Sequence, residues 1–161
     1  MKLVAFLTLL CLLVVNAEEV QDHRSPKQCY HKNYSDLYKI GIYCVKFFNK
    51  HLDFNTARVT CQKSFKYGEL VSVHSKAANN LLTSLISSSH IGYAWLGGFL
   101  QGSNWIWTDG SVFDYHRFVS GPETNNPQCS ALKESGSWVP MNCSKALPFY
   151  CAFPEYYRNK K

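Results

Sequence analysis

The chain has no apolar run long enough to cross a bilayer. The longest run, residues 3–15, falls short of the roughly 20 apolar residues that a membrane-spanning helix needs. Lys2 precedes this run and small side chains occupy both ends of residues 15–17, which is typical of a cleaved secretory signal peptide. We therefore expect residues 1–17 to be a signal peptide and the protein to be secreted and extracellular, without a transmembrane anchor.

The sequence also lacks a basic patch and any recognisable catalytic motif. Lys and Arg number 17 against 11 Asp and Glu, a formal net charge of +6, but the longest basic run is only Lys160-Lys161. This distribution indicates a solvated surface with a mild preference for anionic partners and argues against nucleic acid. None of the six histidines lies in a zinc-hydrolase or nucleophile motif. We therefore expect the protein not to be an enzyme.

Closely spaced cysteine pairs are missing as well. Of the seven cysteines, Cys11 lies in the expected signal peptide, and the other six show no CxxC spacing of the kind found in zinc or redox sites. In an exported chain, an even number of cysteines predicts disulfides, here three. The count alone leaves their pairing open.

Tryptophan is concentrated in one stretch, residues 95–111 (WLGGFLQGSNWIWTDGS). Each indole can bury roughly 150–250 Å², so we interpret these rings as core side chains. Gly97 and Gly98 indicate either a close backbone approach or a positive φ. Residues 105–107 are predicted to form a short strand that a turn at 108–111 closes.

Two helices are predicted before the tryptophan stretch. Asp53 can cap the first and Ser75 the second, because their side chains can accept hydrogen bonds from free backbone N–H groups. His74 then ends the strand before the second helix. The apolar positions at helical spacing are Phe54, Ala57, Cys61 and Phe65 in the first helix, and Ala78, Leu81, Leu82, Leu85 and Ile86 in the second.

Short strands and loops account for the rest of the chain. Residues 18–28 are polar and are expected to form a flexible N-terminal segment, and the chain after Ser111 is loop-like as far as the prolines at 122 and 127. Asn33 and Asn142 each begin an Asn-x-Ser sequon and are predicted to be glycosylated. Further strands are predicted at residues 43–48, 69–73, 129–132 and 149–153, with a turn at 135–137.

These elements follow a distinctive order. A strand and a helix with Cys61 near its end precede an LVSV strand, a second helix, WLGG, WIWTDGS, and three spaced cysteines ending in PFYCAF. This order resembles the C-type lectin-like domain family over nearly all of residues 29–153. The resemblance implies an α+β fold with two helices, small antiparallel sheets and a long loop region that carries ligand binding. It leaves residues 154–161 as a C-terminal tail.

The resemblance also implies a disulfide pairing. Cys61–Cys151 and Cys129–Cys143 match the two usual bridges of the family, and Cys29–Cys44 matches the additional bridge of its long form. By loop-closure entropy, the short N-terminal bridge is worth about 3 kcal/mol and the long Cys61–Cys151 bridge somewhat over 4 kcal/mol. Such bridges would keep a domain with a large irregular region folded outside the cell.

Sugar-binding members of this family work through a calcium ion, which needs several oxygen ligands. In the family pattern these come from an acid-or-amide, proline, acid-or-amide triplet in the long loop and from an Asn-Asp pair after a tryptophan. Here Val139 and Pro140 follow Trp138, and Gly121 precedes the proline of the loop. The usual calcium ligands are therefore largely absent.

The remaining oxygen donors are few. The Asn126-Pro127-Gln128 triplet has the right form but abuts Cys129, out of the family's register, and carries no charge. Glu123, Asn125 and Asn126 could together supply one carboxylate. We therefore expect neither a metal nor another cofactor at the family's usual site.

The first functional hypothesis is a secreted binding protein that recognises its ligand without calcium. The ligand could be a polyanionic glycan, a microbial surface or another protein, because aromatic and cationic groups can stack on sugars or pair with sulfate or carboxylate. The alternative for residues 114–118 is a partly buried loop without a ligand. The expected ligand-binding residues are Tyr115, His116, Arg117, Glu123, Asn125 and Asn126.

Two other functions stay open at this point. One is a calcium-dependent carbohydrate-binding lectin with a divergent site around residues 123–126, joined by Asn142. The other is a secreted effector, such as an antimicrobial, toxin-like or ice-binding protein, although no regular threonine array or extreme charge favours it. Innate immunity is the setting that the family resemblance implies, and the oligomeric state is not predicted.

Overall fold

The computed structural model describes residues 29–155 except 30, 32 and 122–125. The expected signal peptide, residues 1–17, and the expected flexible segment, residues 18–28, lie outside the described residues. The elements are β1 (Leu37–Ile40), β2 (Tyr43–Leu52), α2 (Phe54–Ser64), β3 (Glu69–Leu70), α3 (Lys76–Ser88), β4 (Tyr93–Gln101), β5 (Asn104–Trp107), β6 (Gln128–Lys133), β7 (Trp138–Asn142) and β8 (Leu147–Pro154). Within this described part, no helix is long and apolar enough to cross a membrane.

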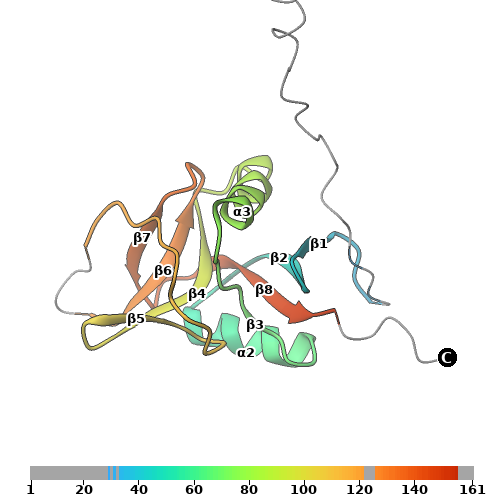
Figure 1. Cartoon of the computed structure of the whole chain (residues 1–161), viewed down its shortest axis with the longest axis horizontal. Helices are drawn as coiled ribbons and strands as arrows, with labels where there is room; N and C mark the ends of the chain where they lie inside the picture. The colour runs from blue at the N-terminus through green and yellow to red at the C-terminus, as the bar shows by residue number, and fades with distance from the viewer. Residues whose placement is uncertain (1–28, 30, 32, 122–125, 156–161) are drawn as a thin grey trace, which may run out of the picture.

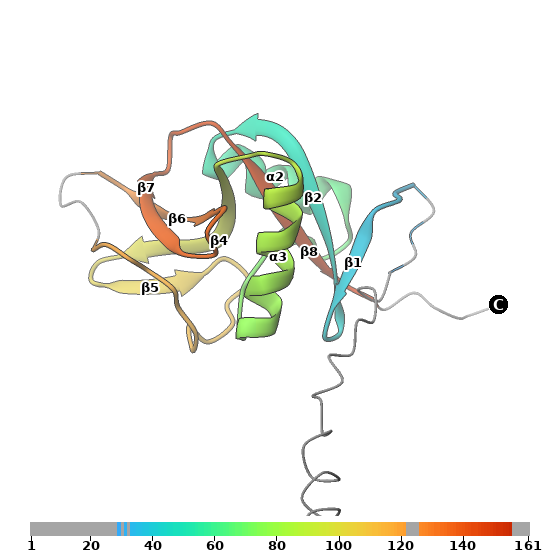
Figure 2. The ribbon, with the colours of Figure 1, turned by 90° about the horizontal axis from the view of Figure 1, so that it is seen from above.

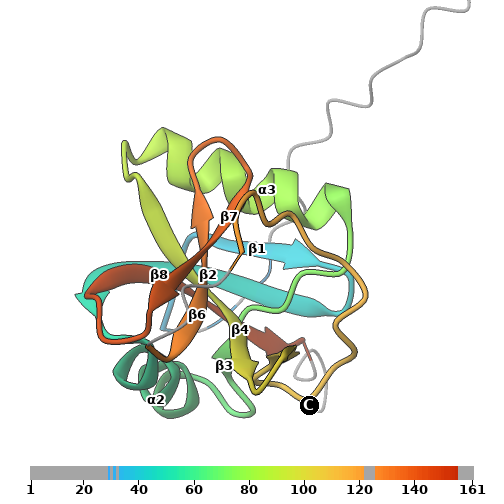
Figure 3. The same ribbon diagram turned by 90° about the vertical axis from the view of Figure 1, so that its left-hand side faces the viewer.

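Both helices begin at their predicted caps. Thr56 N donates a hydrogen bond to Asp53 Oδ1 at 3.0 Å before α2, and Ala78 N donates to Ser75 Oγ at 3.2 Å before α3. These bonds satisfy backbone donors that the first turn of a helix leaves free. The two helices then lie on opposite sides of the sheet (Figures 1 and 3). The prediction of two helices is confirmed.

The strands join in one mixed sheet of eight strands, where small antiparallel sheets were expected. The order along the sheet is β1-β2-β8-β4-β6-β7, with β3 paired to β8 and β5 to β4. All of these pairs are antiparallel except β4 and β8, which meet in parallel at Trp95 and Phe149. This parallel contact joins the two halves of the domain, so the last strand of the chain lies in the middle of the fold (Figure 2).

The predicted strand at residues 69–73 is shorter than expected. Only Glu69–Leu70 forms β3. Beyond it, Val71 N donates to Tyr150 O at 3.0 Å and Val71 O accepts from Gly97 N at 2.8 Å. Because this residue shares its two hydrogen bonds between β8 and β4, the chain stays extended without continuing one ladder.

The sequence pattern does not predict β1, β7 or the full length of β4. In particular, the turn at 135–137 leads into β7, which pairs with β6 from Leu132↔Trp138 to Gln128↔Asn142. Pro140 lies within β7 and lowers its strand signal, but β7 is at the end of the sheet order, where a missing backbone N–H is tolerated. Pro140 therefore explains why the sequence pattern does not predict the edge strand β7.

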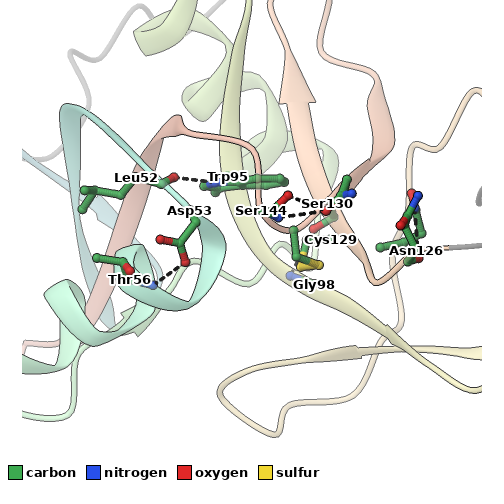
Figure 4. Close-up of a disulfide and its surroundings, with 12 residues drawn as sticks. Leu52, Asp53, Thr56, Trp95, Gly98, Asn126, Cys129, Ser130 and Ser144 are labelled. Atoms are coloured by element: carbon green, nitrogen blue, oxygen red, sulfur yellow. Dashed lines mark hydrogen bonds between the residues drawn. A yellow bond between two sulfur atoms is a disulfide. The ribbon is translucent and has the colours of Figure 1, made fainter.

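The tryptophan stretch is core, as predicted. Trp95 and Trp107 are buried, and Trp95 Nε1 donates to Leu52 O at 3.0 Å (Figure 4). Gly97 and Gly98 provide close approach, with φ angles outside the positive range. A Cβ atom on Gly97 would lie 2.6 Å from Leu70 O, and one on Gly98 would lie 2.6 Å from Ser130 Oγ, so any side chain would push strands apart. Only glycine fits at these two positions.

The structure contains the three disulfides that the family resemblance implies. They join Cys29 to Cys44, Cys61 to Cys151 and Cys129 to Cys143. The first ties the start of the described chain to β2, and the second ties α2 to β8. The third links β6 to the residue that follows β7.

Candidate functional site

The long loop rests on a set of packed rings that we call the aromatic shelf. The shelf consists of Trp105, Trp107, Phe113, Phe118 and Trp138. Trp105 stacks on Phe118 with 4.4 Å between ring centroids, and Trp107 stacks on Phe113 with 4.6 Å. The buried Trp138 ring forms T-shaped contacts with Trp107 and Phe118, with 5.6 Å between ring centroids in both cases. This packing gives fixed positions to a segment that has no regular secondary structure.

Trp138 links the shelf to both the loop and α3. Its Nε1 donates to Asn79 Oδ1 at 2.7 Å, and Asn79 Nδ2 donates to Gly136 O at 2.8 Å, so a buried amide is satisfied on both sides. Its backbone N donates to Arg117 O at 2.8 Å and its backbone O accepts from Val119 N at 3.1 Å. The backbone on both sides of Phe118, including the carbonyl of Arg117, is therefore held by the same tryptophan.

The residues predicted for the long loop divide into two groups. His116 and Arg117 are exposed, whereas Tyr115 is half-buried, with its ring edge against Trp138 at 5.8 Å. The interpretation of residues 114–118 as a partly buried loop thus holds for Tyr115 and Phe118. Of the three residues predicted in this segment, His116 and Arg117 are therefore the two with exposed side chains.

The structure describes only part of the predicted set of acid and amide oxygen donors. Asn126 is exposed and its backbone O accepts from Gln128 Nε2 at 3.1 Å. In Figure 4 it lies on the chain just ahead of Cys129. Glu123 and Asn125 lie outside the described residues. The structure therefore places one of the three donors and leaves their grouping a prediction.

The described residues do not fit the family's calcium site. Val139 and Pro140 occupy β7, opposite Ala131 and Ser130, where the family pattern has oxygen ligands. Gln128 Oε1 is buried without a hydrogen-bond partner in the described part, but it is a single neutral oxygen. Calcium needs several oxygen ligands, with carboxylates among them. In the described ranges, the one clustered set of metal-type side chains includes Cys29 and Cys44, whose sulfurs form a disulfide.

A polar cluster next to the shelf was not found from the sequence. His74 Nδ1 lies 2.7 Å from Asp114 Oδ1, and its Nε2 lies 3.2 Å from Ser111 Oγ. The hydrogen bond to His74 holds the pKa of Asp114 below its usual value. The cluster joins the end of the extended segment before α3 to the loop some forty residues later, so no local pattern could reveal it.

These contacts follow the order of a Ser-His-Asp hydrolase site without its chemistry. The Ser111 hydroxyl donates to Asp109 Oδ1 at 2.6 Å, so its proton points away from His74. Asp109 Oδ1 also accepts from Ser111 N at 2.9 Å, which makes this a local turn. The cluster holds the start of the long loop, with Ser111 engaged in a local turn with Asp109.

A second surface lies beside β2, β3 and the start of α3. Two adjoining hollows share four lining residues, Tyr43, Tyr67, Glu69 and Asp109. We call them together the tyrosine hollow. The deeper one has a volume of about 90 Å³. Its remaining lining residues are Ile40, Val45, Val71, Ser72, His74, Ser75, Ala78 and Ala152.

Sequence reasoning missed this hollow because its walls come from four separate segments. Tyr43 begins β2, Tyr67 and Glu69 lie around the turn after α2, and Asp109 closes the turn after β5. Glu69 accepts hydrogen bonds from Arg58 Nε at 2.8 Å and from Gln62 Nε2 at 2.6 Å.

Comparisons with known proteins agree with this architecture. Rat lithostathine is 31% identical over 160 residues, covering 92% of this chain and 95% of its own. Mouse proteoglycan 3 is 32% identical over 105 residues, covering 62% of this chain, which spans only 47% of that relative. The structure of human lithostathine superposes with a TM-score of 0.69 at 26% identity, covering 75% of this chain and 98% of that one.

A family model identifies the domain directly. The model for the lectin C-type domain matches residues 50–153, which run from β2 to β8 and include both helices, the aromatic shelf and the long loop. This match covers well over half of the chain. The protein belongs to the C-type lectin domain family.

Proposed function

We propose that this chain is a secreted, calcium-independent binding protein that recognises anionic groups on an extracellular glycan or protein. The observation that carries the proposal is the presentation of His116 and Arg117 on the aromatic shelf. Arg117 is exposed, while its own backbone O is fixed by Trp138 N. A cationic side chain on a fixed backbone loses less conformational freedom on binding than one on a mobile loop.

The chemistry of the two side chains favours sulfate or carboxylate. A guanidinium group donates two parallel hydrogen bonds to such groups, and the adjacent imidazole can donate a third. The net charge of +6 adds a weak attraction towards polyanions. Recognition through Arg117 and His116 needs no metal ion.

Independence from calcium is supported by the poor fit of the described residues to the family's site. The side chains of Val139 and Pro140 offer no oxygen. The predicted donors Glu123, Asn125 and Asn126 would bring one carboxylate among them. We therefore assign the long loop a role in direct recognition by side chains.

An extracellular, non-enzymatic role is supported by three features. The six cysteines of the domain are paired, as is usual for secreted proteins. Asn33 is exposed, as glycosylation would require, while Asn142 is half-buried and its Oδ1 accepts from Ser144. The Ser111 hydroxyl is directed to Asp109, which argues against hydrolysis at that cluster. Both sequons remain predictions.

Binding to heparin in excess chelator tests this proposal, with desulfated heparin as the ligand control. Arg117→Ala should weaken binding roughly tenfold, as expected for the loss of a charge-assisted hydrogen bond. Lys63→Ala is the matched control, because it removes one exposed positive charge from α2, which is a different element. Equal losses in the two variants, or no binding without calcium, would contradict the proposal.

A further inference from the structure

The tyrosine hollow has a feature that packing alone does not require. Tyr67 is 69% exposed and has a φ of 59°, a left-handed conformation that disfavours large side chains. Glycine or asparagine would satisfy this backbone more easily. Strained positions of this kind are concentrated at binding sites. The turn therefore holds an exposed aromatic ring in place where a smaller residue would suit the fold better.

The lining of the hollow contrasts with the charge of the whole chain. Two carboxylates, from Glu69 and Asp109, line both parts of the hollow, and its lining includes no lysine or arginine. Glu69 is paired with Arg58. Within the described residues, Asp109 accepts only from neutral donors, from Ser111 and from Ser72 Oγ. Asp109 therefore offers a carboxylate acceptor in this wall, beside the imidazole of His74, which also lines the deeper part.

The size and floor of the hollow restrict the ligand further. The deeper part of the hollow has a volume of about 90 Å³, well above the roughly 10–15 Å³ that a single water molecule needs, so a slender group of a few non-hydrogen atoms can enter it. Its floor is aliphatic, formed by Val45, Val71, Ala78 and Ala152. A short methylene chain that ends in a hydrogen-bond donor fits this combination of volume and lining.

We propose that the tyrosine hollow binds an alkylammonium group, namely a lysine side chain of a protein partner. The methylene chain would lie on the aliphatic floor between Tyr43 and Tyr67, and the ammonium group would donate to Asp109. Ammonium groups are attracted both to carboxylates and to the faces of tyrosine rings. The turn already shows such a contact, because Lys66 Nζ lies 5.2 Å from the Tyr67 ring centroid.

This site is independent of the proposed function of the long loop. It would take a cation, whereas His116 and Arg117 would take an anion, and the two sets share no residue. Arg117→Ala should leave lysine binding at the hollow unchanged. Failure of one proposal would therefore leave the other standing.

The first test is an NMR titration of the ¹⁵N-labelled protein with acetyl-Ser-Lys-Ser-amide. The amides of Tyr67, Gly68, Ser72 and Asp109 should shift, and they should reach saturation. The matched peptide with norleucine, which keeps the methylene chain but lacks the charge, should bind roughly threefold to tenfold more weakly. Equal binding of the two peptides, or shifts elsewhere on the domain, would overturn the proposal.

Two variants then separate recognition from folding. Asp109→Asn keeps an acceptor for Ser111 N but removes the charge, and should reduce the preference for lysine over norleucine. Tyr67→Gly should raise the thermal unfolding midpoint by relieving the left-handed backbone, yet weaken lysine binding. A Tyr67→Gly variant that binds the peptide as tightly as the unaltered protein would overturn the role of the ring.

The basic end of the chain gives a further control. Pro154 lines the outer part of the hollow, and the residues after Glu155 include Arg158, Lys160 and Lys161. A variant that ends at Glu155 should bind the lysine peptide with unchanged affinity. Tighter binding by this variant would show that the chain's own end competes for the hollow, and would overturn its assignment to a partner.

Discussion

The aromatic shelf and the tyrosine hollow both display aromatic side chains, but they are held in different ways. Trp105 and Trp107 of the shelf lie on β5 and Trp138 lies on β7, whereas Phe113 and Phe118 lie outside the named strands. The rings are fixed by one another and by the Trp138–Asn79 hydrogen bond. The deeper part of the hollow lies among β2, β3 and the start of α3. Cys29–Cys44 ties β2 to the start of the described chain, and Cys61–Cys151 ties α2 to β8. The shelf also has a disulfide nearby, because Cys129–Cys143 links β6 to the residue after β7, but its rings are held by their contacts with one another.

This difference relates to what each surface presents. On the shelf, the aromatic rings are largely inward and the cationic side chains point out, so that a polar group performs the recognition. At the hollow, Tyr43 and Tyr67 themselves are exposed, at 43% and 69%. A strained and exposed ring needs a rigid support, and two disulfides supply it.

The largest expected effect comes from removing the Cys61–Cys151 bridge with a double change to alanine. Its 90-residue separation should be worth about 4–5 kcal/mol of unfolding free energy by loop-closure entropy. The same change at Cys129–Cys143, with a separation of 14, should cost about 3 kcal/mol. Urea unfolding measures both, and a larger loss from the shorter bridge would contradict the entropic account.

A smaller loss of unfolding free energy should follow from Asn79→Ala, which removes the hydrogen bonds that Asn79 makes with Trp138 Nε1 and Gly136 O. The variant leaves Trp138 Nε1 and Gly136 O buried without their partner. An unpaired buried polar group costs about 1–3 kcal/mol, so urea unfolding should show a loss in this range. Thr83→Ala, one turn further along α3, is the control, since its hydroxyl donates only to Asn79 O. Heparin binding should fall with Asn79→Ala and persist with Thr83→Ala.

The sequence predicts best what is local. The caps at Asp53 and Ser75 depend on neighbouring residues, and both are confirmed. The buried tryptophans follow from side-chain size, and the disulfide pairing follows from the family resemblance. By contrast, the strand at 69–73 was overestimated because its alternating pattern cannot show that Val71 divides its hydrogen bonds between two strands.

The sites were harder to predict because they join distant segments. The His74–Asp114 contact spans 40 positions, and Tyr43, Tyr67 and Asp109 meet only through the sheet. The exposure of each side chain could not be predicted either. Tyr115 and Arg117 are two residues apart, but the Tyr115 ring packs on Trp138 whereas the Arg117 side chain is exposed. A composition argument could nominate residues 114–118 without deciding which of them faces a ligand.

Stability should also depend on pH through Asp114 at the start of the long loop, with a smaller effect than that of Asn79→Ala. The pKa of Asp114 is lowered by its hydrogen bond from His74, so this contact stabilises the fold above the unfolded pKa of about 3.9. This contribution to stability should disappear as the pH falls through the lowered pKa that Asp114 has in the folded protein. Thermal unfolding of the unaltered protein and of Asp114→Asn should therefore differ at pH 6 and converge towards pH 2. His74→Ala should remove this difference, and a difference that persists at pH 2 would contradict the assignment.

The smallest expected effect is that of calcium on the thermal unfolding midpoint. A site filled at 100 times its dissociation constant would add about 2.7 kcal/mol, and each kcal/mol raises the midpoint of a domain this size by about 2–4 °C. Because Val139 and Pro140 supply no oxygen ligand, we expect the midpoint to be the same in millimolar calcium, in equal magnesium and in excess chelator. A rise with calcium alone would require carboxylates that the shelf does not supply. Repeating the measurement with Glu123→Gln would then show whether the long loop provides one, and the shelf would become the support of a metal site instead of a direct binding surface.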